Sequence, residues 1–283
     1  MRNGEMKKMR KGSLLFVPSG GLANRMRAIA SALVLTQQTG SRLQVVWFQD
    51  WALNAPFSSI FQPIDCVPLR EATWADHLLY DRARCRNLYL PAVPQRLMFE
   101  RHIKEQMVTP LKKQQFDFQA WATGCRCYMS CYQVFGQFPD TVYGKLFHPV
   151  KEVMQMVDSF RDHFSDHTIG LHIRRTDNAE SIEKSPTALF VKKVEEEIDH
   201  HSDTHVFVAT DDEGVKHELK ERFGQRIITP SATASRNDIE GIRGGLADMY
   251  TLAATCHIYG SAGSSFSPMA ASIGNTPLEI ISL

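Results

Sequence analysis

Residues 167–177 read HTIGLHIRRTD, and this stretch decides how the second half of the chain is interpreted. Apolar residues alternate with small or polar ones over 169–173, which is the pattern of a β-strand. The strand runs directly into Arg174 and Arg175. Ligands of open α/β sheets bind beyond the carboxyl ends of strands, and guanidinium groups bind phosphate oxygens bidentately. The stretch predicts either a diphosphate clamp on an α/β sheet, or two arginines that are solvated or paired with Asp177 in a salt bridge that fixes the loop.

Strands and helices alternate through the rest of this half. Strands are expected at 169–173, 204–209, 226–228 and 257–261, and helices at 185–200, 213–223, 245–255 and 265–273. Such alternation produces a parallel sheet with right-handed crossovers. The second half therefore has the pattern of an α/β domain.

The first half opens in a similar way and then becomes irregular. A strand is expected at 13–18, a helix at 22–39 and a strand at 43–48, with Gly40 ending the helix. Within 50–150 only three elements stand out: a short helix after the loop at 55–61, a strand at 128–132 and a helix at 150–163. That last helix marks the expected boundary between domains 1–150 and 151–283.

Composition excludes several classes of protein. The chain has 283 residues, 43% of them hydrophobic, and a formal net charge of +1, which argues against a nucleic-acid partner. No apolar run approaches the roughly 18 residues of a membrane span. The apolar run 14–17 is too short for a signal peptide, so a cytoplasmic location is expected. The basic residues before it either contact an anionic membrane surface peripherally or form a solvated tail.

The six cysteines are expected to be free thiols, because no signal sequence directs the chain to an oxidising compartment. They are Cys66, Cys85, Cys125, Cys127, Cys131 and Cys256. The C-x-C-x3-C spacing of the middle three is not a common zinc pattern, so buried thiols are the preferred interpretation.

Three further segments join an expected strand to an expected helix. They are Gly20-Gly21-Leu22-Ala23-Asn24-Arg25, Thr210-Asp211-Asp212 and the run GSAGSSFS at 260–267. Glycines let the backbone approach a ligand, and helix N-termini bind anions, although the first segment could equally be a plain tight turn. The aspartates could accept hydrogen bonds from ribose or a base, or one could cap the next helix. The third segment predicts a phosphate cradle.

Asp248 lies sixteen residues before Ser264, on the helix expected to precede the cradle. A lone aspartate on a helix is usually on the surface. Because residues 248–256 are otherwise mostly apolar, burial with a partner is the favoured alternative here.

These segments resemble, in order and spacing, the motifs of the GDP-fucose fucosyltransferase superfamily. The segments are 20–25, 172–177, 206–212 and 248–267. The resemblance covers the start and the whole second half of the chain. It is nearest to the branch of the α1,6-fucosyltransferases and nodulation fucosyltransferases, and more distant from the α1,2- and protein O-fucosyltransferases. Residues 50–150 match no motif.

The resemblance implies a GT-B architecture of two Rossmann-like domains with a cleft between them. The C-terminal domain would bind the GDP-sugar and the N-terminal domain the acceptor. Transfer would be inverting and independent of metal, since an arginine clamp supplies the charge that a cation bound by an Asp-x-Asp motif supplies elsewhere.

The resemblance also assigns roles to individual residues. Arg174 would stabilise the leaving GDP, with Arg175 supporting it or holding the loop. His172 and Asp248 would contact guanine. The remaining donor-binding residues would be Gly20, Gly21, Asn24, Asp211, Asp212, Ser264 and Ser265.

The chain departs from the α1,6 pattern just after Asp177. The relatives continue with a lysine and, a few residues on, a glutamate implicated in acceptor activation. Here Asn178 replaces the lysine, and Glu180 and Glu183 flank the position of the glutamate. Both are catalytic candidates. The expected function is transfer of fucose from GDP-fucose to a glycan hydroxyl in α1,6- or α1,2-linkage, as in polysaccharide biosynthesis. The alternatives are another GDP-sugar as donor, or a nucleotide-sugar binding protein with decayed catalysis.

Overall fold

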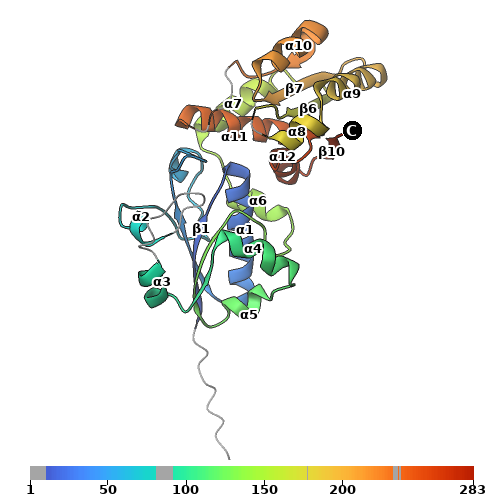
Figure 1. Ribbon diagram of the computed structural model, residues 1–283. Coiled ribbons are helices and arrows are strands. Elements are labelled where there is room, and N and C mark those ends of the chain that lie inside the picture. Colours follow the sequence, from blue (N-terminus) through green and yellow to red (C-terminus); the bar gives the residue numbers. More distant parts are fainter. Residues whose placement is uncertain (1–10, 81–91, 177, 232–234, 236) are drawn as a thin grey trace, which may run out of the picture. The chain divides into compact units, whose positions relative to one another are not determined.

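The computed structural model describes residues 11–80, 92–176, 178–231, 235 and 237–283 (Figure 1). The chain divides into two compact units, each described by itself below. The first comprises Met1–Gln49 and Pro63–Pro139, and the second Asp50–Gln62 and Asp140–Leu283. The predicted halves meet at residue 150, so they differ from these units over 140–150 and 50–62.

Segment 50–62 belongs to the second unit through backbone contacts. Phe61 forms an antiparallel bridge with Pro149. The guanidinium of Arg243 donates a hydrogen bond of 2.8 Å to the carbonyl of Ser59. A continuous domain boundary cannot be read from sequence when a segment packs against residues nearly 200 positions away.

The first unit contains a parallel five-stranded sheet in the order β3-β2-β1-β5-β4. Its strands are β1 (Ser13–Pro18), β2 (Arg42–Trp47), β3 (Leu69–Glu71), β4 (Arg101–Ile103) and β5 (Arg126–Cys131). Its helices are α1 (Leu22–Thr39), α2 (Asp76–Leu79), α3 (Ala92–Met98), α4 (Glu105–Lys113) and α5 (Phe118–Ala122). The central strand β1 is buried almost throughout, which explains its unbroken apolar sequence.

Helix α1 ends as the sequence predicts. Gly40 adopts a left-handed conformation with φ of 62°, and its amide donates to the carbonyls of Gln37 and Thr36. A residue without Cβ enters this conformation at no steric cost, so the glycine stops the helix and turns the chain into β2.

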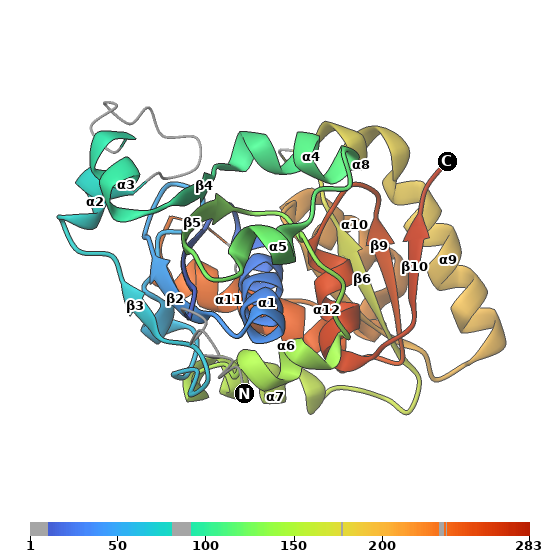
Figure 2. The ribbon, with the colours of Figure 1, turned by 90° about the horizontal axis from the view of Figure 1, so that it is seen from below.

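The second unit contains another parallel five-stranded sheet, in the order β10-β9-β6-β7-β8. Its strands are β6 (Thr168–Ile173), β7 (His205–Thr210), β8 (Ile227–Ile228), β9 (His257–Ser261) and β10 (Leu278–Ile281). Figure 2 shows β6, β9 and β10 side by side. The chain passes outward from β6 to β8 and then returns to the other side of β6. This order is Rossmann-like, and the reversal between β6 and β9 is the place where such sheets bind ligands.

Helices cover both faces of this sheet. They are α6 (Thr141–Leu146), α7 (Lys151–Arg161), α8 (Ala179–Lys184), α9 (Thr187–His200), α10 (Glu213–Phe223), α11 (Ile239–Ala253) and α12 (Phe266–Gly274), with short 3₁₀ turns at Phe57–Ser59 and Gly224–Arg226. Ile169, Leu171 and Ile173 of β6 share one core cluster with residues of α9 and α10. Gly170 faces the other way, against Leu252 of α11. His172 lies on this second face, because side chains alternate along a strand.

Several elements differ from the sequence-based expectation. Helix α11 begins at Ile239, six residues earlier than predicted, because Asp238 caps it by accepting from the amide of Gly241. Helix α8 occupies a segment for which no helix was expected, and β10 was not predicted. Glycines at the start of α11 hide the helical pattern, and the four residues of β10 are too few to show a period.

None of the helices in the described ranges is long and apolar enough to cross a membrane. Five of the cysteines lie in these ranges, and all are free thiols. Cys127 and Cys131 are buried, and burial raises the pKa of each to about 12. Cys125, the third cysteine of the C-x-C-x3-C run, is only partly buried, so the expectation of buried thiols is confirmed for two of these three. Cys85 and the basic residues at 2–10 lie outside the described residues.

Candidate donor site of the second unit

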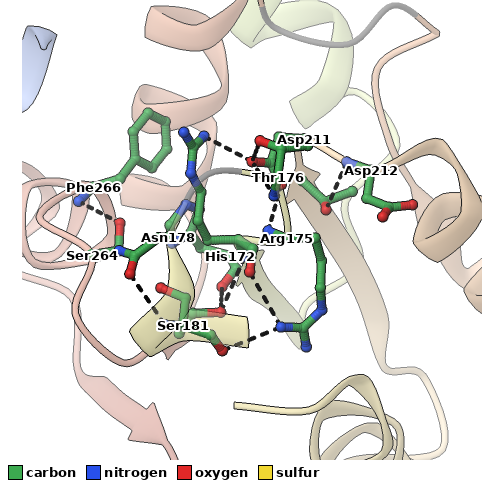
Figure 3. A network of polar contacts seen from close by, with 12 residues as sticks. His172, Arg175, Thr176, Asn178, Ser181, Asp211, Asp212, Ser264 and Phe266 are labelled. Atoms are coloured by element: carbon green, nitrogen blue, oxygen red, sulfur yellow. Dashed lines mark hydrogen bonds and ion pairs between the residues drawn. The ribbon is translucent and has the colours of Figure 1, made fainter. Parts of the chain in front are cut away.

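Three neighbouring strands of the second sheet end side by side and present polar segments. Arg174 follows β6, Asp211 follows β7, and the loop 262–264 follows β9 (Figure 3). Parallel strands bring their carboxyl ends to one edge of the sheet, so these segments meet although they are far apart in sequence. The amide of Arg174 links two of them, because it donates to Ser261 Oγ at 3.1 Å.

Asp211 organises the turn after β6. Its carboxylate accepts hydrogen bonds from the amide of Arg175 at 2.7 Å and from the amide and hydroxyl of Thr176 at 3.2 and 2.5 Å. Its Oδ2 also lies 3.0 Å from Nη1 of Arg174. Burial alone would raise the pKa of this carboxyl, but these donors and the arginine charge outweigh it and lower the pKa. Asp211 is therefore an ionised anchor that fixes the position of the Arg174 guanidinium.

The guanidinium of Arg175 holds a different part of the chain. It donates to the carbonyls of Arg174 and Ser181, at 3.2 and 3.3 Å, and to that of Ser185. Its Nε also donates to Thr187 Oγ1 at 3.3 Å. These contacts tie α8 and the start of α9 to the end of β6. They correspond to the second of its two predicted roles, holding the loop.

Helix α8 packs directly on the loop after β9. Asn178 caps α8 by accepting from the amide of Ser181, and its Nδ2 donates to the carbonyl of Gly263 at 3.1 Å. Ser181 Oγ donates to the carbonyl of Ala262 at 2.6 Å. Glu180 lies so close that a Cβ on Gly263 would stand 2.6 Å from its Oε2. Of the two glutamate candidates, Glu180 thus touches this loop, while Glu183 is exposed further along α8.

His172 is buried beside the start of α12. Its ring stacks on Phe266, with ring centroids 4.8 Å apart and an angle of 23° between the planes. Burial and the charge of Arg174 lower the pKa of His172 to about 4, so the imidazole is neutral near pH 7. Its Nδ1 has no hydrogen-bond partner among the described residues. Buried polar atoms of native proteins are rarely left unpaired, so this nitrogen is suited to a ligand.

Asp248 is a second buried group of this kind. It lies on α11 with 6% of its surface exposed, and within the described part of the chain its Oδ1 accepts no hydrogen bond. Burial raises the pKa of Asp248 to about 7, partly offset by the charge of Lys216. The predicted burial is therefore observed. No hydrogen bond among described residues joins Asp248 to the network around Asp211.

The remaining predicted residues are distributed as follows. Asp212 caps α10 by accepting from the amide of Val215, one of the two roles considered for these aspartates. Ser264 Oγ accepts from the amide of Phe266 at 3.3 Å, and Ser265 is the residue before α12. Asp177 lies outside the described residues. Direct contacts of these side chains with a donor stay predictions.

Gly20, Gly21 and Asn24 belong to the first unit. Gly20 has φ of 80°, and its carbonyl accepts from Nε of Arg25 at 2.8 Å. Arg25 is fully buried and also donates to the carbonyl of Phe48 at 2.5 Å. In this unit the segment thus forms a tight turn fixed by a buried arginine, and its role in donor binding stays a prediction.

Sequence reasoning missed the residues that hold the network together. They are Thr176, Ser181, Ser185, Ser261 and Phe266. Asn178 followed three residues later by Ser181 is a recognisable helix start, and would have indicated α8. Ser261 and Phe266 lie in the run 260–267 singled out from the sequence, but nothing indicated their individual roles. Thr176 and Ser185 gave no signal, because single serines and threonines are common in every loop.

Comparisons with known proteins agree on the fold. No family model matches the sequence, and no curated protein matches it. Among solved structures, an α1,6-fucosyltransferase NodZ soaked with GDP-fucose is 17% identical, with a TM-score of 0.66 over 93% of both chains. The fucosyltransferase NodZ from Bradyrhizobium is 18% identical, with a TM-score of 0.64 over 92% of this chain and 93% of that one. FUT1 from Arabidopsis thaliana, in complex with GDP, is 15% identical, with a TM-score of 0.63 over 96% of this chain and 70% of that one.

The chain has the fold of the GT-B fucosyltransferases. The predicted fold class, with two Rossmann-like parallel sheets, is confirmed. The solved structures are those of the group that the sequence motifs resemble. The expected cleft between the domains stays a prediction.

Proposed function

We propose that this protein is a fucosyltransferase that moves fucose from GDP-fucose to a hydroxyl group of a glycan. One observation carries the proposal. At the carboxyl end of β6, Asp211 fixes the partly exposed guanidinium of Arg174. The chain around it has the fold of fucosyltransferases whose structures were solved with GDP or GDP-fucose. A fixed guanidinium at this position suits a diphosphate, because it presents two parallel donors to phosphate oxygens.

The donor would bind across the ends of β6 and β9. The diphosphate contacts Arg174 and the backbone and hydroxyl of Ser264 at the start of α12, where helix amides favour anions. Guanine presents donors on its N1 and N2 edge, which require acceptors. The oxygen of Asp248 that has no partner among the described residues and the neutral ring of His172 are suited to this base.

The reaction is a direct displacement. The acceptor oxygen attacks the anomeric carbon of fucose, the bond from that carbon to the diphosphate breaks, and the configuration inverts. GDP leaves with the bonding electron pair, and Arg174 stabilises the negative charge that develops on it. The proposal needs no metal ion at the diphosphate, because the guanidinium supplies the positive charge.

The acceptor proton requires a base. Glu180 is the preferred candidate, because it lies against Gly263 in the loop expected to hold the phosphates. Its carboxylate is 2.8 Å from Nζ of Lys184, and both side chains are about half exposed, so the pair can open when an acceptor binds. Glu183, one turn further along α8, is the second candidate.

We expect the acceptor to bind to the first unit and to residues 50–150. We expect the new linkage to be α1,6 or α1,2. A cytoplasmic enzyme of polysaccharide biosynthesis would fit this chemistry. We expect a glycan rather than a nucleic acid as acceptor.

A donor panel tests the proposal. Wild-type protein is incubated with GDP-fucose, GDP-mannose and a UDP-sugar, and both thermal shift and released nucleotide are measured. A fucosyltransferase is supported if GDP-fucose raises the melting temperature and is slowly hydrolysed, while GDP-mannose and the UDP-sugar have neither effect. Turnover of GDP-mannose instead supports a different GDP-sugar, whereas binding without hydrolysis or transfer indicates a binding protein.

A further inference from the structure

Three potential metal ligands meet at the end of the second sheet that is opposite to the donor site. His167 immediately precedes β6, while Glu197 and His201 lie in and just after the last turn of α9. One ligand atom from each lies within 4.8 Å of those of the other two. Strand β6 separates this cluster from Arg174 by roughly 20 Å, since a strand rises about 3.3 Å per residue.

The geometry of the cluster brings a carboxylate and an imidazole into direct contact. Nε2 of His167 lies 2.8 Å from Oε2 of Glu197. The rings of His167 and His201 stack with centroids 3.8 Å apart and 23° between their planes. Glu197 and His201 are four residues apart, so they project from the same side of the helix end.

A second layer of contacts orients the carboxylate. The hydroxyl of Tyr259, on β9, donates to Oε1 of Glu197, which leaves Oε2 directed at His167. Burial would raise the pKa of Glu197, but the hydrogen bonds from Tyr259 and His167 outweigh it and lower the pKa. An outer residue that fixes a ligating carboxylate is a regular feature of metal sites in proteins.

We propose that His167, Glu197 and His201 form a binding site for a divalent transition metal, of which zinc is the best fit. Two imidazoles and one carboxylate suit zinc, whereas magnesium and calcium prefer oxygen ligands alone. His201 is exposed, and rotation of its ring out of the stacked position directs a nitrogen at the metal. Water completes the four ligands.

A bound metal would act on the fold rather than on the transfer reaction. The metal would link His167, which precedes the central strand β6, to the end of α9. It should therefore stabilise the folded second unit at the end of the sheet opposite the donor site.

His217 and Cys256 of the same unit provide matched controls. His217 and Glu221 form another histidine–glutamate pair with i,i+4 spacing, 3.2 Å apart, but both are exposed and belong to no three-ligand cluster in the described ranges. Cys256 Sγ lies 3.8 Å from Nδ1 of His167, on the ring edge away from Glu197. The proposal assigns no ligand role to His217, Glu221 or Cys256.

The test is titration calorimetry of tag-free, chelator-treated full-length protein with ZnCl₂, with MgCl₂ as the hard-cation control, together with melting curves. One zinc per chain and a higher melting temperature are expected. Loss of an outer residue that orients a metal ligand typically costs about 10–100-fold in affinity, so Tyr259→Phe should weaken zinc binding by about that factor. Glu197→Gln and His201→Gln each remove a ligand and should weaken zinc binding by more. His217→Gln and Cys256→Ser should bind zinc like the wild type.

The proposal is overturned if zinc does not bind, or if Glu197→Gln and His201→Gln bind as tightly as His217→Gln. Circular dichroism of each metal-free variant checks that it is folded. His201 is exposed, so its replacement by glutamine leaves the core intact and keeps the test decisive even if Glu197→Gln does not fold.

Discussion

Nη1 of Arg174 lies 3.0 Å from Oδ2 of Asp211, and the two residues follow adjacent parallel strands. Asp211 also holds the amides of Arg175 and Thr176, so one carboxylate fixes both the backbone and the charge of the turn. The guanidinium is therefore held in place before any ligand arrives. Such preorganisation is what makes a charged group effective in stabilising a transition state.

Replacement of Arg174 tests this arrangement. Arg174→Ala should lower kcat by about 10²–10³, because a preorganised contact to the departing diphosphate is lost. Arg174→Lys should also be poor, since an ammonium does not reproduce the planar fork. Release of GDP from GDP-fucose measures both variants. Arg161→Ala, which removes an exposed arginine 3.8 Å from Asp158, is the control and should retain full activity. Near wild-type turnover of Arg174→Ala would exclude the arginine from the reaction.

Asp212→Ala separates the two roles considered for that residue. As the cap of α10 it should contribute to stability, and its loss should cost about 0.5–2 kcal/mol. Asp238→Ala removes the comparable cap of α11 and should also lower stability. Denaturant unfolding gives both values. The affinity of Asp212→Ala for GDP should equal that of the wild type, and a clear loss would instead indicate contact with the nucleoside.

Asp248 should make GDP binding dependent on pH. Its pKa is raised to about 7, and the ionised form is the better acceptor for guanine. Calorimetry should show affinity falling as pH drops below 7, approaching tenfold per pH unit. Asp248→Asn should weaken binding by about 2–5 kcal/mol, as for loss of a buried charged partner, and should remove this dependence. Equal affinity of the wild type for GDP and UDP would argue against a guanine pocket here.

The same carboxyl should also affect the stability of the ligand-free protein. In the unfolded chain Asp248 ionises near pH 3.9, whereas in the folded protein it keeps its proton up to about pH 7. The folded state therefore binds more protons between these values, and this group's contribution to stability falls as pH rises from about 4 to 7. The slope approaches 1.4 kcal/mol per pH unit, or about one proton. Denaturation at several pH values should show this slope in the difference between wild type and Asp248→Asn.

Chelation should separate catalysis from metal binding. Since Arg174 supplies the charge at the diphosphate, fucosyl transfer should survive EDTA at temperatures well below the melting point. The melting temperature itself should fall if zinc occupies the site at His167. A requirement for manganese or magnesium in the chemical step would instead place a cation near Asp211 and contradict the arginine mechanism.

The sequence predicted most of the second sheet, because β7, which is buried on both faces, reads as a nearly continuous apolar run and β6 shows apolar residues at alternate positions. It predicted the first unit poorly beyond β2. Strands β3 and β4 have only three residues each, too few for any periodicity to appear. The segment 50–62 shows why the predicted limit at residue 150 differs from the two compact units, since its packing depends on residues far away in the chain.

The candidate site shows a similar division. The positions of Arg174 and Asp211 at strand ends follow from the strand pattern, so they could be predicted. The choice between the two roles considered for Arg175 could not be made from sequence, because it depends on where the carbonyls of Ser181 and Ser185 lie after α8 folds. The cluster at His167 was also invisible, since its three residues lie in two segments that are joined only by the packing of α9 on the sheet.

Gly263 has φ of 72°, and Glu180 occupies the space next to it that a side chain would need. A substitution at residue 263 therefore meets both backbone strain and a collision with the candidate base. Among descendants of a common ancestor, glycine here should persist wherever a carboxylate persists at 180, and a lineage that loses one should soon lose the other. Covariation between these two positions would then record which branches kept the same acceptor chemistry.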